Sequence, residues 1–273
     1  MSYRAASSKL QMKHLDDIPV WLFALLTVVA FDATALVGLV CTRWLGHAFG
    51  VYALLDNNIV GWIFSAILVM YAIAIGLIAI ATWGNASNAS AAASQEASHI
   101  VTLYRTLAGY PEPLRSEFTR SIFAYTQSVI QIAWPAQRRG EVTEKGTEIL
   151  FSVGRRVLEF EPTTSGQSIV HAEALSAFNT LVELRRRRIE ATTYAVPASL
   201  WVVVLIGAAL SIFASYLFNI ESLLAQSLLT MLLASMIALL VFFIATTDHP
   251  YRGVNAIKPR AYEIVLRNLT DLP

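Results

Sequence analysis

The sequence predicts an all-α, multi-pass membrane protein with four transmembrane helices and a helical domain between the second and third. Of its 273 residues, 56% are hydrophobic and only 14% are charged. A soluble domain usually carries about 25% charged residues, so this composition indicates burial in lipid. Two further observations agree with it: four long apolar segments, and a one-sided distribution of lysine and arginine.

The four apolar segments are long enough to cross a bilayer. About 20 helical residues span the ~30 Å hydrocarbon layer. The last two segments are joined by three residues, which predicts an antiparallel hairpin. The first has too long an apolar run for a signal peptide and three more segments follow it, so we interpret it as an uncleaved anchor. The segments are residues 18–41, 59–83, 194–218 and 222–247.

Lysine and arginine predict the orientation. Of 20 such residues, Arg43 is the one that falls between the first two spans, and the hairpin of the last two has none. The other 19 lie in regions that four spans place on one face, which should be the cytoplasmic face of the cell (inner) membrane. We therefore expect a cytoplasmic N-terminal tail (1–17), a first helix pair (18–83), a cytoplasmic helical domain (84–193), a hairpin (194–247) and a cytoplasmic C-terminal tail (248–273).

The central region carries apolar residues at helical spacing, which predicts a bundle of four amphipathic helices. We expect the first to continue the second span and the last to run into the third span. Proline-containing segments at 110–113, 135–140 and 162–166 should separate the helices. The apolar stripes are Ile100, Leu103, Leu107; Phe118, Ile122, Tyr125, Val129, Ile132; Leu150, Val153, Val157, Phe160; and Leu175, Phe178, Val182, Ile189.

Two charged residues fall on these apolar stripes. Glu96 shares a face with Ile100, and Arg185 fills the skipped position between Val182 and Ile189. A charge on an apolar face needs a partner. We therefore predict that Glu96 and Arg185 form a structural ion pair in the bundle.

Asp32 lies inside the first span, where an aspartate costs about 2.5–3.5 kcal/mol at mid-membrane. Either it is an ion or proton site that faces a cavity, or it locks two helices by a hydrogen bond. Arg185–Arg188 stand less than two turns before the third span. They either contact lipid phosphates, or some of them line an anion path or pair inside the bundle.

One stripe on the second span, Ile63, Ile67, Met70 and Ala74, is a candidate hydrophobic pore lining; lipid exposure is the alternative. After the fourth span, Asp248, Pro250 and Gly253 belong to a terminal motif in which Pro250 ends the helix. Asp248 is unfavourable near a helix C-terminus, so we expect it to have a partner, such as Arg252 or a backbone amide.

Several classes of function find no support. The net charge is +1 and the central region is nearly neutral, so we expect no nucleic-acid partner. One cysteine and five scattered histidines predict no metal site. No phosphate loop, paired carboxylates or Ser/His/Asp set is recognisable in the sequence. We expect neither an enzyme nor a cofactor.

Several segments together resemble the bacterial bestrophin-like membrane proteins, from about residue 60 to the C-terminus. They are Glu96 with Leu103-Tyr104-Arg105, residues 110–115, Trp134-Pro135, Arg185 and Arg188, Pro197 with Leu200-Trp201, and residues 248–253. One departure is Ala133, where that family typically has a glutamate before Trp-Pro. The resemblance implies a pentamer around a central axis that conducts chloride and other anions. The acidic cluster with which animal bestrophins bind calcium is missing, so calcium gating is not implied.

The leading hypothesis is therefore a homo-oligomeric ion channel that conducts anions rather than cations. Its expected partners are the lipid bilayer and small anions. A non-conducting scaffold or signalling module that acts through its cytoplasmic bundle is the first alternative. A proton-coupled transporter that uses Asp32 is the second. Transporters usually show repeats and broken helices near the midplane, and the sequence shows neither.

Overall fold

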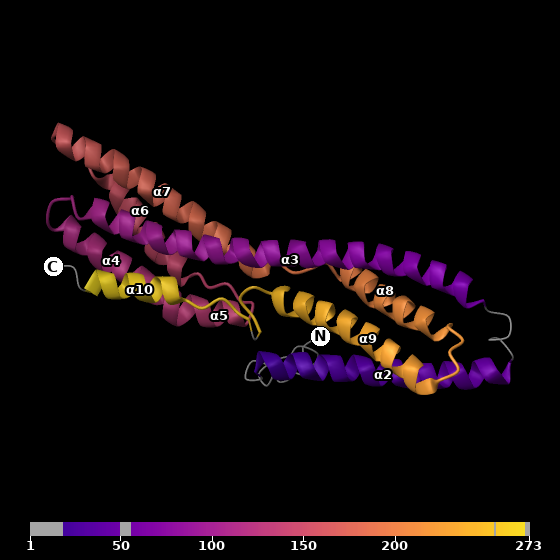
Figure 1. Cartoon of the computed structure of the whole chain (residues 1–273). Helices are drawn as coiled ribbons and strands as arrows, with labels where there is room; N and C mark the ends of the chain where they lie inside the picture. Colours follow the sequence, from indigo (N-terminus) through magenta and orange to yellow (C-terminus); the bar gives the residue numbers. More distant parts are fainter. Residues whose placement is uncertain (1–18, 50–55, 254, 271–273) are drawn as a thin grey trace, which may run out of the picture. The chain divides into compact units, whose positions relative to one another are not determined.

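The computed structural model describes residues 19–49, 56–253 and 255–270 (Figure 1). The predicted N-terminal tail and the first residue of the first span lie outside these residues. The described chain is helical and has no strand, so the all-α class is confirmed. Its elements are α2 (Val20–Ala48), α3 (Asn57–Leu107), α4 (Leu114–Ser128), a π-helical turn η2 (Val129–Ala133), α5 (Trp134–Arg138), α6 (Lys145–Glu159), α7 (Ser165–Thr193), α8 (Ala198–Tyr216), α9 (Leu223–Thr247) and α10 (Arg260–Thr270).

The chain forms two compact units. The first unit contains the described residues up to Gly84 together with Ala195–Asp248, and the second contains Asn85–Tyr194 with the described residues from His249 onward. Helices α2, α3, α8 and α9 are each long and apolar enough to cross a membrane. Each of the four predicted spans thus corresponds to one helix. The alanine- and serine-rich residues 85–94 belong to α3, so the first helix of the central region continues the second span, as expected.

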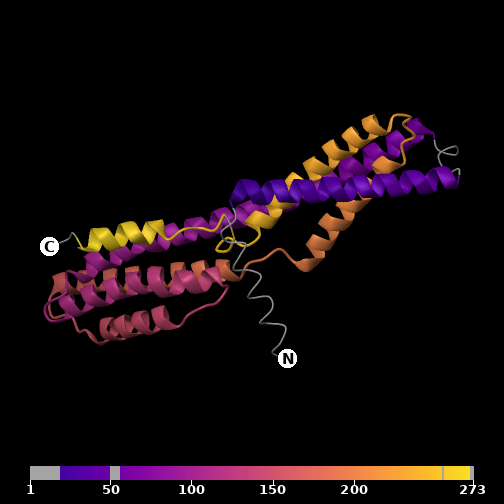
Figure 2. The ribbon, with the colours of Figure 1, turned by 90° about the horizontal axis from the view of Figure 1, so that it is seen from below.

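In the first unit, α2 lies along α9 and α8 packs on both (Figure 2). Two tyrosines fill spaces opposite glycines. A Cβ at Gly207 would lie 2.4 Å from the Tyr71 ring, and one at Gly38 would lie 2.6 Å from the Tyr216 hydroxyl. The tyrosine hydroxyls donate to backbone carbonyls of the same neighbouring helices, Tyr71 to Val204 at 3.1 Å and Tyr216 to Ala35 at 2.8 Å. The missing side chains therefore let the helices approach closely.

Arg43, the exception in the predicted charge distribution, is bound by the turn between α8 and α9. Its Nη1 donates to the Ile220 carbonyl at 3.0 Å and to Gln226 Oε1 at 2.8 Å. Its Nη2 donates to the Glu221 carbonyl at 2.9 Å. These carbonyls follow α8, so Arg43 fixes the hairpin turn to α2.

The second unit buries one aromatic and aliphatic core. Helices α4, α6 and α7 supply most of it, together with the later part of α3, and α10 packs against α4 and η2 (Figure 1). Helix α10 lies in the predicted C-terminal tail, for which we made no prediction of secondary structure. It buries Tyr262, Val265 and Leu269, which follow each other at steps of three and four.

Two expectations about helix ends are wrong. The chain stays helical through Pro135, because the π turn η2 directly precedes it. A π turn changes the register of the backbone hydrogen bonds, which accommodates the missing N–H and the ring of a proline. Helix α7 does not run into the third span, since it ends at Thr193 and α8 begins after Pro197.

Candidate functional site

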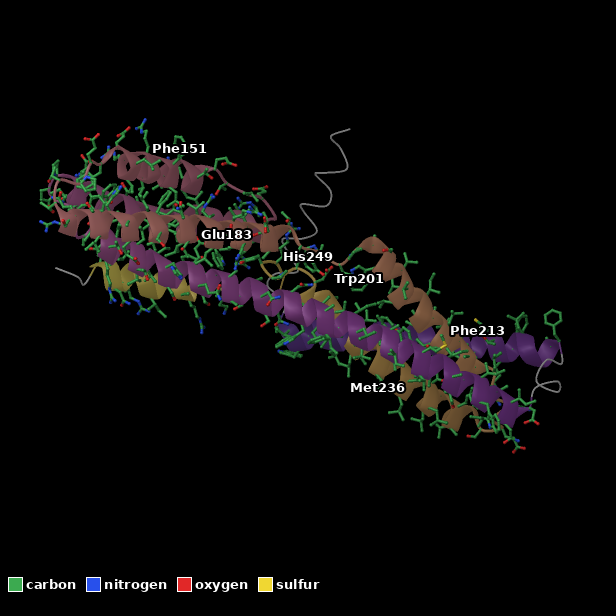
Figure 3. The ribbon with its side chains drawn as sticks, turned by 90° about the horizontal axis from the view of Figure 1, so that it is seen from above. Phe151, Glu183, Trp201, Phe213, Met236 and His249 are labelled. Carbon is green, nitrogen blue, oxygen red and sulfur yellow. The ribbon has the colours of Figure 1, made fainter. Side chains whose placement is uncertain are left out.

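The predicted pore-lining stripe lies on α3 in the first unit. Ile63 and Met70 are 58% and 75% exposed, and Ile67 and Ala74 are half-buried. This face therefore takes little part in the core of its own chain. Exposed apolar side chains also cover other helices of this unit, including Phe213 on α8 and Met236 on α9 (Figure 3). Exposure alone does not distinguish a face that lines a pore from a face that contacts lipid, so the pore-lining role of this stripe stays a prediction.

Asp32 on α2 is half-buried and accepts a hydrogen bond from α9. The Ser235 hydroxyl lies 3.1 Å from Oδ1 and 3.0 Å from Oδ2. A carboxylate that accepts from a neighbouring helix is partly compensated for its transfer from water. This contact supports the helix-locking interpretation over the ion-site one.

A buried ion pair lies at the centre of the second unit. Arg188 Nε is 2.5 Å from Glu96 Oε2, and Arg188 Nη2 is 3.3 Å from Glu96 Oε1. Arg188 is 1% exposed and Glu96 is fully buried. The bidentate geometry uses both carboxylate oxygens, which is the strongest arrangement of this pair.

The predicted partner of Glu96 is wrong: it is Arg188 and not Arg185. The cause is the phase of α7. Its buried face carries Ala174, Ala177, Leu181, Leu184, Arg188 and Thr192, whereas Val182 is 41% exposed. The pattern of large apolar residues thus selected a face one residue away from the buried one. Glu96 was placed correctly, since Ala93, Ala97 and Ile100 around it are buried.

Aromatic residues enclose the pair. The Tyr125 hydroxyl donates to Glu96 Oε1 at 2.5 Å. The Arg188 guanidinium carbon lies 6.0 Å from the Trp134 ring centroid and 5.9 Å from that of Tyr262. Arginine above aromatic faces at this distance gains cation–π attraction. Neither Trp134 nor Tyr262 was assigned to a site from the sequence, although Trp134-Pro135 is among the segments that carry the family resemblance.

Burial and charge fix the protonation states in this cluster. Burial raises the pKa of Tyr125 and of Tyr262 well above the ordinary value, and the Glu96 carboxylate raises both further. Burial alone would lower the pKa of Arg188, but the attraction and hydrogen bond of Glu96, together with Tyr262 and Tyr125, outweigh burial and the pKa is raised. The tyrosines therefore stay neutral and Arg188 stays cationic at physiological pH.

A small cavity adjoins this cluster, with a volume of about 10 Å³. It is lined by Arg185 and Arg188 from α7, Gln137 from α5, and Ala133 at the end of the π turn, among others. Arg185 Nη2 donates to the Thr147 hydroxyl at 2.9 Å. Ala133, the position of the departure from the family pattern, thus lines the same cavity as two arginines.

The terminal motif holds the start of α8 and leads into α10. Asp248 Oδ1 accepts from the Val196 N–H at 2.5 Å, and Oδ2 accepts from Trp201 Nε1 at 3.3 Å. A backbone amide is therefore among its partners, as expected. Within the second unit, the Pro250 carbonyl accepts from the Ile257 N–H at 2.9 Å. Gly253 has φ of 78°, a conformation that favours glycine.

Comparison with known proteins gives a family. The model of the bestrophin-like domain matches residues 28–262. No curated protein matches the chain. Solved structures of a bacterial bestrophin homologue from Klebsiella pneumoniae are similar in fold, at 14% identity with a TM-score of 0.67 over 92% of this chain and 99% of that one. A second variant of that homologue gives 16% identity and a TM-score of 0.65 over 92% and 98%.

Proposed function

The chain belongs to the bestrophin-like family, and from this premise we propose that it assembles as a homo-oligomeric channel that conducts small anions, chloride among them, across the cell (inner) membrane. Family and fold support a bestrophin-type channel. The number of subunits, five by resemblance, belongs to the proposal.

The exposed α3 stripe is the observation that carries this proposal. Ile63 and Met70 face away from the core of their own chain, so a ring of subunits could bring these side chains around one axis. Apolar constrictions gate channels by dewetting. Four apolar helices of one chain leave little room for a water path, so conduction requires several copies.

The placement of charge favours anions over cations. Asp32 accepts from Ser235 inside its own subunit, which is consistent with a place at a helix interface. A ring of carboxylates on the axis would favour cations. Nineteen of the 20 lysines and arginines lie in the predicted cytoplasmic regions, where they would concentrate anions near the pore entrance.

Conduction is tested with purified protein in liposomes under a salt gradient. We expect chloride flux and a reversal potential near that of chloride, and we expect Asp32→Asn to leave the selectivity unchanged. Cation selectivity that Asp32→Asn abolishes would overturn the anion assignment. A well-folded oligomer that passes no ion at any pH or voltage tested would favour the scaffold alternative.

The pore stripe is tested by cysteine accessibility in a Cys41→Ala background. A charged, water-soluble thiol reagent should change the flux through Met70→Cys channels by severalfold. Leu232→Cys on α9, where the native side chain is 66% exposed, is the matched control and should not respond. Equal responses of the two variants would remove the stripe from the pore.

A further inference from the structure

The cavity beside the buried ion pair is surrounded by polar groups that lack partners. Arg188 Nη1, Arg185 Nε and Gln137 Oε1 are buried and have no hydrogen-bond partner among the described residues. Their residues all line the cavity. Arg188 and Gln137 are 1% and 2% exposed. Buried donors and acceptors without a partner are costly and rare, so these two donors and one acceptor point to an occupant.

The charge around the cavity is unbalanced. Arg188 is compensated by Glu96, which occupies its Nε and Nη2. Arg185 forms no ion pair among the described residues, and its guanidinium donates to the neutral Thr147 hydroxyl. None of the residues that line the cavity is an aspartate or glutamate. The site therefore carries one guanidinium charge more than the protein neutralises.

The walls of the cavity limit the size of the occupant. A volume of about 10 Å³ holds one water molecule or one ion of similar size. Gly146 forms part of the wall, and a Cβ there would lie 3.2 Å from the Tyr125 ring and 3.4 Å from Arg185 Nε. The π turn that ends at Ala133 lines another side; such turns occur frequently at functional sites.

From this geometry we propose that the cavity is a binding site for one small monovalent anion, of halide size, held by Arg185 and Arg188. Arg188 Nη1 and Arg185 Nε donate to the ion, and the Gln137 amide turns its NH₂ group toward it, since the two ends of an amide exchange by rotation. The anion neutralises the surplus charge and links α5 to α7. The site lies within the second unit and does not depend on conduction.

Thermal unfolding of the full chain in detergent tests the site. At constant ionic strength, chloride or bromide at about ten times its Kd should raise the unfolding midpoint by about 3–6 °C relative to gluconate, which is too large to enter. Arg185→Gln should lose this shift. Arg186→Gln is the matched control, because Arg186 is exposed and pairs with Glu190, and it should keep the shift.

A second variant places a carboxylate of the protein in the cavity, where it would take the place of the bound ion. Ala133→Glu should make the midpoint independent of halide, whereas Ala124→Glu, on the exposed face of α4, should not. Crystals grown in bromide should show an anomalous peak in the cavity. A halide shift that Arg185→Gln retains, or a cavity that holds water and no bromide, would overturn the proposal.

Discussion

At the scale of single residues, the second unit is organised around one buried charge pair. Arg188 contacts Glu96 by two nitrogen atoms, and its guanidinium carbon lies 6.0 Å and 5.9 Å from the ring centroids of Trp134 and Tyr262. Removing one member of such a pair leaves a buried charge without compensation, which typically costs about 3–5 kcal/mol. The pair therefore determines how α3 and α7 align in this unit.

A double-mutant cycle tests the pairing. Glu96→Gln and Arg188→Gln should each lower the free energy of unfolding by about 3–5 kcal/mol. Their combination should cost less than the sum, with a coupling energy above about 1 kcal/mol. The measurement is reversible unfolding of the purified chain in mixed micelles.

A matched double-mutant cycle tests Arg185, in place of Arg188, as the partner of Glu96. Glu96→Gln and Arg185→Gln should be nearly additive, because Arg185 donates to Thr147 and is not paired with Glu96. Strong coupling in this second cycle, with none in the first, would restore the partner that the sequence pattern suggested.

At the scale of elements, the helices of the first unit share an aliphatic core that includes Leu39, Ile75 and Ile244, and two tyrosines also lie against glycines of neighbouring helices. Gly207 on α8 receives the Tyr71 ring of α3, whereas a Cβ at Gly76 on α3 would meet nothing within 4 Å. Two glycines on membrane helices thus have different roles. One permits close approach, and the other lies on a face that its own chain leaves open.

The two glycines give a paired prediction. Gly207→Ala should destabilise the fold by about 1–3 kcal/mol, since overpacking displaces the Tyr71 ring. Gly76→Ala should be neutral or slightly stabilising, because alanine has the better helix propensity by about 1 kcal/mol. Unfolding in mixed micelles compares them; a Gly76→Ala variant as unstable as Gly207→Ala would contradict the packing.

The sequence predicts an element well where a single physical property, such as length or hydropathy, determines that element. The four spans follow from length and hydropathy alone, and α2, α3, α8 and α9 each correspond to one. The buried face of α7 did not follow, because Ala174 and Ala177 pack closely although alanine adds little to a hydrophobic pattern. The face was therefore assigned from Leu175 and Val182, which lie one residue further along the chain.

The candidate site was predicted in part for the same reason. Glu96 was recognisable as a charge on an apolar stripe. Trp134 and Tyr262 contact Arg188 from segments far apart in the sequence, and no local pattern encodes such a tertiary contact. The cavity beside Ala133 was not predictable either, because it depends on the π turn before Pro135.

At the scale of the whole molecule, the distribution of charge defines the expected topology. Lysine and arginine are almost excluded from two segments, and the exception, Arg43, is engaged by the carbonyls of the α8–α9 turn. Its charge is thus used in a structural contact. The remaining basic residues should face the cytoplasm.

Thiol labelling of intact cells tests this topology in a Cys41→Ala background. Ser165→Cys, at the exposed start of α7, should react with a membrane-impermeant reagent only after lysis. Glu221→Cys, in the α8–α9 turn, should react before lysis and serves as the positive control. Labelling of Ser165→Cys in intact cells would reverse or break the predicted orientation.

The close contacts of Tyr71 with Gly207 and of Tyr216 with Gly38 also constrain how this sequence can evolve. A larger residue at Gly207 or Gly38 is tolerated only if Tyr71 or Tyr216 becomes smaller at the same time. Each single step passes through a destabilised form, so selection acts on the two positions as one unit. Among descendants of this chain, glycine and tyrosine should be gained and lost together, and such covariation would reveal these helix contacts from sequences alone.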